Sequence, residues 1–82
     1  VYSLLDGKYE FLEAKILETS DLVNKSIKES NLPEEVRIGA IVRKNKVIMP
    51  KSNFIFEKDD IVVVLSKREQ LKEVEDIFRI TS

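Results

Sequence analysis

The chain has 82 residues, of which 43% are apolar, so it can form one small domain around a single modest core. Its 14 basic and 15 acidic residues leave a formal net charge of −1, whereas a duplex-binding domain usually carries a clear positive excess. We therefore expect no nucleic-acid partner. The sequence has no cysteine and no histidine, which excludes disulfide bonds, the usual zinc sites, thiol nucleophiles and imidazole acid–base catalysis.

Two structures are possible for the first eight residues, and the segment that follows them is predicted to be a strand. The chain begins at Val1 rather than Met, so we expect a domain of a longer protein. Residues 1–8 contain an Asp6-Gly7 turn signal and form either an edge strand or the end of a linker. Residues 9–17 alternate between apolar and charged side chains, which predicts a half-buried strand with one apolar face formed by Leu12, Ala14 and Ile16.

A helix is predicted next, near residues 21–30. Ser20 supplies an N-cap oxygen, and Asp21 places negative charge at the positive end of the helix. Apolar residues follow at helical spacing, and Pro33 cannot continue the helix. Asn31 can adopt the left-handed conformation that ends it.

Three further strands are expected near residues 36–43, 46–49 and 61–65. Lys44-Asn45 suits the tight turn of a hairpin between the first two. Strict alternation places Arg37 and Arg43 on the same face of the first strand, and Ile38 and Ile41 on opposite faces. The run "IVVVL" at residues 61–65 is typical of a central strand that is buried on both faces.

The last element is a second helix near residues 67–78. Ser66 and Glu69 have the spacing of a capping box, and the apolar stripe consists of Leu71, Val74 and Phe78. The predicted fold class is therefore α+β, a small β-α-β-β-β-α domain with a mostly antiparallel sheet. Apolar side chains on both faces of the hairpin strand predict a homodimer, with three candidate interface residues: Val36, Ile38 and Ile41.

No residue pattern predicts catalysis. Glu57, Asp59 and Asp60 lie close together in one turn and could hold a hard cation, but turn acids are more often solvated or bonded to their own backbone. There is no glycine-rich phosphate loop, since the only glycines are Gly7 and Gly39. We expect neither an enzyme nor a metal site.

The one local charge imbalance is basic. No acid lies between Val36 and Phe56, and this stretch supplies the candidate ligand-binding residues Arg37, Arg43 and Lys46. Six residues of extended strand separate the two arginines by about 20 Å, so a dimer would be needed to bring one arginine from each chain to the same small anion or nucleotide. The alternative is that these charges only keep the hairpin soluble and prevent edge-to-edge pairing.

The segment from Leu32 to Leu65 resembles the carboxy-terminal regulatory domain of the TrkA family, also called the RCK C-terminal domain. The matching residues are Leu32-Pro33, "IGAIVR" at 38–43, "VIMP" at 47–50, and Asp60 followed by "IVVVL". The likeness covers roughly residues 9–80. The common Gly-Asp before the last strand is Asp59-Asp60 here. Asp tolerates a left-handed turn, so the fold is expected to survive this difference.

The resemblance implies a ligand-responsive, dimer-forming module that acts in the cytoplasm at the inner face of the cell membrane. Such modules follow a nucleotide-binding Rossmann domain and regulate a membrane potassium transporter or channel. The family's NAD or ATP belongs to that upstream domain, so no cofactor is expected on this chain. One branch binds a cyclic dinucleotide at the dimer interface, but its arginine-bearing segment is not matched by "NLPEEV" at residues 31–36. The likeness is closer to the TrkA branch.

Two other functions remain open from the sequence. An ACT-like sensor of a metabolic enzyme would have a similar α+β form, but it normally ends on a strand after its second helix, whereas this chain ends shortly after Phe78. A ligand-free oligomerisation module is the other alternative.

Overall fold

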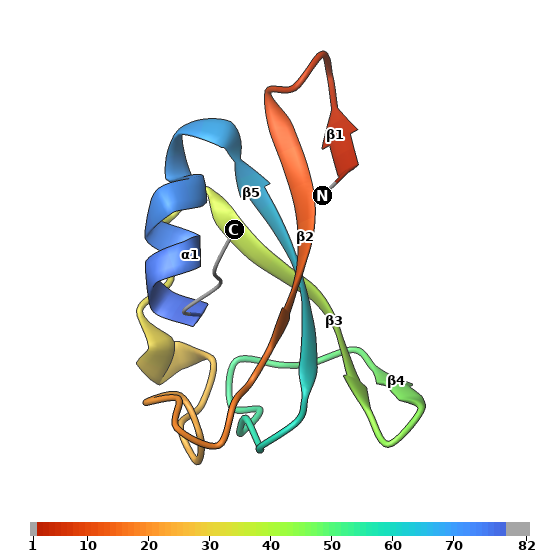
Figure 1. The fold of residues 1–82 in the computed structure, drawn as a ribbon, viewed down its shortest axis with the longest axis vertical. Coiled ribbons are helices and arrows are strands. Elements are labelled where there is room, and N and C mark those ends of the chain that lie inside the picture. The colour runs from red at the N-terminus through yellow and green to blue at the C-terminus, as the bar shows by residue number, and fades with distance from the viewer. Residues whose placement is uncertain (1, 79–82) are drawn as a thin grey trace.

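The computed structural model describes residues 2–78, which form a five-stranded sheet with a short terminal helix (Figure 1). The strand order is β1-β2-β5-β3-β4, and every neighbouring pair is antiparallel. The strands are β1 (Tyr2–Leu4), β2 (Tyr9–Lys15), β3 (Val36–Arg43), β4 (Lys46–Ile48) and β5 (Ile61–Lys67). The predicted α+β class with a mostly antiparallel sheet is confirmed. The last two residues of the predicted domain, 79 and 80, lie outside the described residues.

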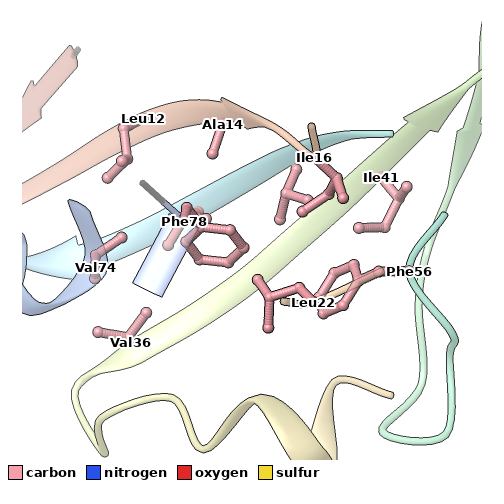
Figure 2. Close-up of a cluster of buried hydrophobic side chains, with 11 residues drawn as sticks. Leu12, Ala14, Ile16, Leu22, Val36, Ile41, Phe56, Val74 and Phe78 are labelled. Atoms are coloured by element: carbon pink, nitrogen blue, oxygen red, sulfur yellow. The ribbon is translucent and has the colours of Figure 1, made fainter. Parts of the chain in front are cut away.

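The helical elements cover one face of the sheet. A 3₁₀ turn, η2 (Arg68–Gln70), leads from β5 into the helix α1 (Leu71–Phe78), and a second 3₁₀ turn, η1 (Lys28–Ser30), lies on the same side (Figure 1). Val74 and Phe78 of α1 point into the core, as the predicted stripe requires. Figure 2 shows them meeting side chains from the sheet and from the connecting segments: Leu12, Ala14, Ile16, Leu22, Val36, Ile41 and Phe56.

The predicted helix at residues 21–30 is wrong. The Ser20 hydroxyl does accept the Leu22 N–H at 3.1 Å, but the turn that follows stops at Asn24, whose φ is 69°. Backbone N–H groups from this segment then bond to residues 52–56: Asn24 to the Phe56 carbonyl at 2.9 Å and Ile27 to the Phe54 carbonyl at 3.0 Å. Only the three residues of η1 are helical, because these donors are used by a neighbouring segment.

The capping box occurs at a different serine from the predicted one. Ser66 donates its hydroxyl to the Lys67 carbonyl at 2.9 Å, and η2 has no side-chain cap. The reciprocal pair of a capping box is made instead by Ser26 and Glu29. The Ser26 N–H donates to Glu29 Oε1 at 2.9 Å, and the Glu29 N–H donates to Ser26 Oγ at 3.2 Å.

A β-bulge at Gly39 changes which side chains of β3 share a face. Ile38 pairs with Val64 and Ala40 pairs with Val63, so the register shifts by one residue between them. Two consequences correct the predictions from strict alternation. Arg37 and Arg43 lie on opposite faces, and Ile38 and Ile41 lie on the same face, toward the core.

The bulge also decides the position of the candidate interface residues. Val36 is 2% exposed and Ile41 is 0% exposed, so both side chains belong to the chain's own core. Ile38 is partly buried and packs against the same core. A side chain that the single chain already buries has no free surface to offer a second copy. A homodimer therefore needs a different surface from the one that these three residues were expected to form.

Candidate ligand-binding groove

An open groove lies between the segment around η1 and the first half of β3. Its volume is about 360 Å³, and its walls carry two cations and one acid among mostly apolar side chains: Ile27, Lys28, Asn31, Leu32, Pro33, Glu34, Val36, Arg37 and Ile38. The first half of β3 is at the edge of the sheet here, because β4 pairs only with residues 41–43. The groove is thus bordered by a strand edge, a turn and two positive side chains.

The wall that carries Lys28 is held by specific bonds. The Ser26–Glu29 capping box fixes the start of η1, and the Lys28 N–H donates to the Ser52 carbonyl at 3.0 Å. Hydrogen bonding to the backbone N–H of Ser26, and then to its side chain, lowers the pKa of the Glu29 carboxyl. Glu29 is therefore ionised at neutral pH. Asn31 ends the turn in the left-handed conformation, with φ 52°, as the sequence predicted.

Arg37 of β3 also lines the groove and is exposed. Its Nη1 donates to the carbonyl of Glu34 at 2.5 Å and to the carbonyl of Val36 at 2.9 Å. Both bonds use one nitrogen, whereas a guanidinium has five N–H donors, so others remain available to a ligand. An anion with phosphate or carboxylate oxygens matches that fork of donors. The arrangement is suited to binding a negatively charged group.

Arg43, the second predicted ligand residue, belongs to a separate cluster. Its Nε and Nη2 each lie 2.7 Å from an oxygen of Asp60, and its Nη2 also donates to the Ile55 carbonyl at 3.0 Å. Nη1 lies 3.0 Å from Glu57, and the guanidinium carbon lies 4.7 Å from the centre of the Phe54 ring. Arg43 is therefore occupied by structural contacts within the chain, and its role in binding a ligand stays a prediction.

The pKa values of the pair reflect these contacts. The hydrogen bond to Asp60 raises the pKa of Arg43, although burial opposes this. Burial alone would raise the pKa of Asp60, but the hydrogen bonds from Arg43 and from the Glu57 N–H outweigh it and hold the pKa below its usual value. Asp60 is only 1% exposed, and the pair remains fully charged at neutral pH.

The other charged candidates lie outside the groove. Lys46 is exposed at the start of β4, beside Arg43, so the structure does not bring the three predicted ligand residues together. The turn acid Asp59 lies 3.9 Å from Lys15, and Glu57 is bonded to Arg43. Within residues 2–78, no group of three or more acids is placed to hold a metal ion.

Lys28 is the groove residue that the sequence reasoning missed. The sequence signal for its position is the Ser-x-x-Glu pattern at residues 26–29. A capping box was predicted only for the second such pattern, at residues 66–69.

In the described part of the chain, none of the helices has the length and apolar character needed to cross a membrane.

The antiparallel sheet with its helical elements on one face places the chain among small α+β domains. Residues 11–79 match the model of the TrkA-C domain, and the chain belongs to this family. The Trk system potassium uptake protein TrkA of Azorhizobium caulinodans is 40% identical over 81 residues, which are 99% of this chain and 18% of that protein. The chain thus spans less than a fifth of that relative.

Solved structures agree on the fold. The RCK C domain of the potassium transport protein KtrA, described in complex with c-di-AMP, has a TM-score of 0.73 and 24% identity, with 88% of this chain and 86% of that chain covered. The RCK_C domain dimer of S. agalactiae BusR, also with c-di-AMP, has a TM-score of 0.72 and 24% identity, with 89% and 94% covered. A longer BusR chain, of which 35% is covered, is described with promoter DNA.

Proposed function

We propose that this chain is the cytoplasmic ligand-sensing domain of a potassium-uptake protein, and that it regulates a membrane potassium transporter or channel subunit. Membership of the TrkA-C family and the relatives' names support the potassium-uptake part. The observation that carries the sensing part is the open groove that both Lys28 and Arg37 line. In this proposal the chain acts by binding, because its groove offers two cations, one acid and apolar surface.

The proposed ligand is a phosphate-bearing nucleotide, and c-di-AMP is the first candidate. The KtrA and BusR domains of similar fold are described with this ligand. Two phosphates in one small molecule suit two separated cations, while the apolar walls formed by Ile27, Leu32 and Ile38 suit purine rings. Neither the chain's net charge of −1 nor its groove suits duplex DNA, and we propose no nucleic-acid partner.

Regulation requires that ligand binding favour one arrangement of the assembly over another. The differential affinity for such coupling is typically 1–3 kcal/mol. A dimer of these domains could supply it if the groove changes shape with the dimer contact. Two arrangements of the domain pair, transmitted to the rest of the protein, would then set the activity of the membrane subunit.

Titration calorimetry of the 82-residue chain with c-di-AMP tests the ligand. Arg37→Ala and Lys28→Ala should each weaken binding by about tenfold, the cost of one charge-assisted hydrogen bond. Lys46→Ala removes the same charge from an exposed site outside the groove and should leave binding unchanged. Equal losses in all three variants would show a general charge effect, and no loss in the first two would overturn the groove as the site.

The regulatory role needs the full-length protein and its membrane partner. Deletion of residues 9–80 should change potassium uptake and abolish its response to the ligand that the calorimetry identifies. Full-length Lys28→Ala should keep the assembly and weaken the response only. Unchanged uptake and an unchanged response after the deletion would overturn the regulatory role.

A further inference from the structure

The sheet has a second face that nothing in the described residues covers. We call it the outer face; its apolar side chains come from the three central strands and are all partly exposed: Phe11, Ala40, Val42, Ile61, Val63 and Leu65. Val47 of β4 extends it and is 70% exposed. The helix α1, both 3₁₀ turns and the core lie on the opposite face (Figure 1).

The sequence of the central strand β5 is typical of a strand with a packed layer on both faces. Val62 and Val64 are 0% exposed on the core side, whereas Ile61, Val63 and Leu65 are only half-buried on the outer side. A half-solvated antiparallel strand normally alternates apolar and polar residues, and a continuous apolar run belongs to strands that are buried on both faces. The run "IVVVL" therefore requires a second layer that residues 2–78 of one copy do not supply.

We propose that a second copy of this chain covers the outer face, with the two sheets packed face to face about a two-fold axis that runs along β5. This inference rests on the proposed function, which needs a dimer, and it assigns the surface. The strand order places β2 and β3 on either side of β5. A two-fold axis along β5 therefore lays β2 of each copy over β3 of the other.

The charges on the outer face match this arrangement. Glu13 on β2 and Ala40 on β3 are both level with Val63. Arg37 is level with Leu65. Leu65 lies two residues from Val63 on the same face of β5, so Arg37 is displaced from the level of Glu13 by about 6.6 Å along the strand. Glu13 thus approaches Arg37 of the partner, and symmetry makes this contact twice. Lys15 and Lys67 lie at the ends of their strands, where long side chains reach solvent at the rim.

The size of the face fits a dimer that can change its arrangement. Three central strands of about 23 Å and two edge strands of three residues, or about 10 Å, spaced about 4.8 Å apart, give a face of about 430 Å². Two copies would cover about 850 Å², which is the size of a weak, reversible interface. Arg37 also lines the groove, so a bound anion and Glu13 of the partner would compete for the same guanidinium. Ligand occupancy would thereby be coupled to the dimer contact.

Sedimentation equilibrium of the 82-residue chain tests the proposal, since the chain has a core of its own. Val63→Lys places two lysines opposite each other on the two-fold axis and should raise the dimer dissociation constant at least tenfold. Leu5→Lys adds the same charge at the exposed β1–β2 turn and should leave the constant unchanged. Circular dichroism must show that both variants keep the wild-type fold.

A charge exchange tests the predicted contact itself. Glu13→Arg and Arg37→Glu should each weaken the dimer, and the double variant should recover most of the loss, which a merely structural role for either residue would not produce. A wild-type chain that stays monomeric at millimolar concentration would overturn both this proposal and the dimer of the proposed function. A Val63→Lys chain that still dimerises would overturn only the outer face as the interface.

Discussion

Arg37 and Arg43 lie six residues apart on one strand, yet the structure uses them in opposite ways. Arg43 is bound on four sides by Asp60, Glu57, the Ile55 carbonyl and the Phe54 ring. Arg37 is exposed, and within residues 2–78 its side chain is bonded only to two nearby backbone carbonyls. The difference begins at Gly39, because the bulge there turns the second arginine to the core side of the sheet and leaves the first on the other side.

This contrast separates a structural cation from a candidate binding cation. Arg43 joins β3 to the segment at residues 54–57 and to the start of β5, so it holds together parts of the chain that are distant in sequence. Among the described residues of one copy, Arg37 bonds only to the adjacent turn. A cation whose donors are already filled cannot bind a ligand without losing stability, whereas one with free donors can.

Arg43→Ala should give the largest loss of stability. It leaves the Asp60 carboxylate buried without its bidentate partner, and breaking a buried pair in this way costs about 3 kcal/mol. Chemical denaturation of the 82-residue chain measures it, with Lys44→Ala at the adjacent exposed turn position as the control. A loss of unfolding free energy below about 1 kcal/mol in Arg43→Ala would show that Arg43 does not hold the structure together.

Acid should weaken the Arg43 cluster through the Asp60 carboxylate. The pKa of Asp60 is lowered in the folded chain, so the unfolded chain binds more protons at low pH. The stabilisation from Asp60 is present above the ordinary aspartate pKa of about 3.9 and is lost as the pH falls through the lower folded value. Unfolding free energies measured from pH 7 to pH 2 should show this decline.

Asp60→Asn should be less stable at neutral pH and should show a smaller decline in acid. The decline should not vanish, because the pKa of Glu29 is also lowered and Glu29 also loses its charge. Equal acid slopes for the wild type and Asp60→Asn would contradict the assigned cause of the Asp60 shift.

The local patterns in the sequence predicted the strands and the last helix but not the pairing between distant segments. Alternation along residues 9–15 depends only on the strand itself, and Leu12 and Ala14 are buried as expected. The helix at residues 21–30 failed because Asn24 and Ile27 donate to Phe56 and Phe54, about thirty residues further along. No local propensity records those partners.

The candidate site was predicted in part for a similar reason. Arg37 lies in the groove, but one bulged residue at Gly39 was enough to reverse the face of Arg43 and to bury Ile41. A glycine inside a strand is a known sign of a bulge, yet it does not say whether the register shifts. Lys28 was missed because two Ser-x-x-Glu patterns occur in the chain and only the structure shows which one forms the cap.

Ser26→Ala should lower the stability less than Arg43→Ala does, through the η1 cap beside the groove. It removes the hydroxyl that accepts the Glu29 N–H at 3.2 Å, and losing a cap of this kind costs about 1 kcal/mol. Glu69→Ala removes the acid of the pattern that forms no cap and is the matched control. If the two variants lose equal stability, the Ser26–Glu29 cap does not hold the groove wall.

Arg37→Ala should have the smallest effect on stability and still weaken ligand binding. Its two bonds lie at the surface, where a single exposed charge contributes about 0–1 kcal/mol, well below the loss expected for Arg43→Ala. The same denaturation experiment compares the two arginines directly, and calorimetry with c-di-AMP follows on the folded variant. A loss for Arg37→Ala as large as that for Arg43→Ala would make both arginines structural. The groove would then have only Lys28 to hold an anion, and a single lysine on an open wall is too little to select one phosphate ligand from another.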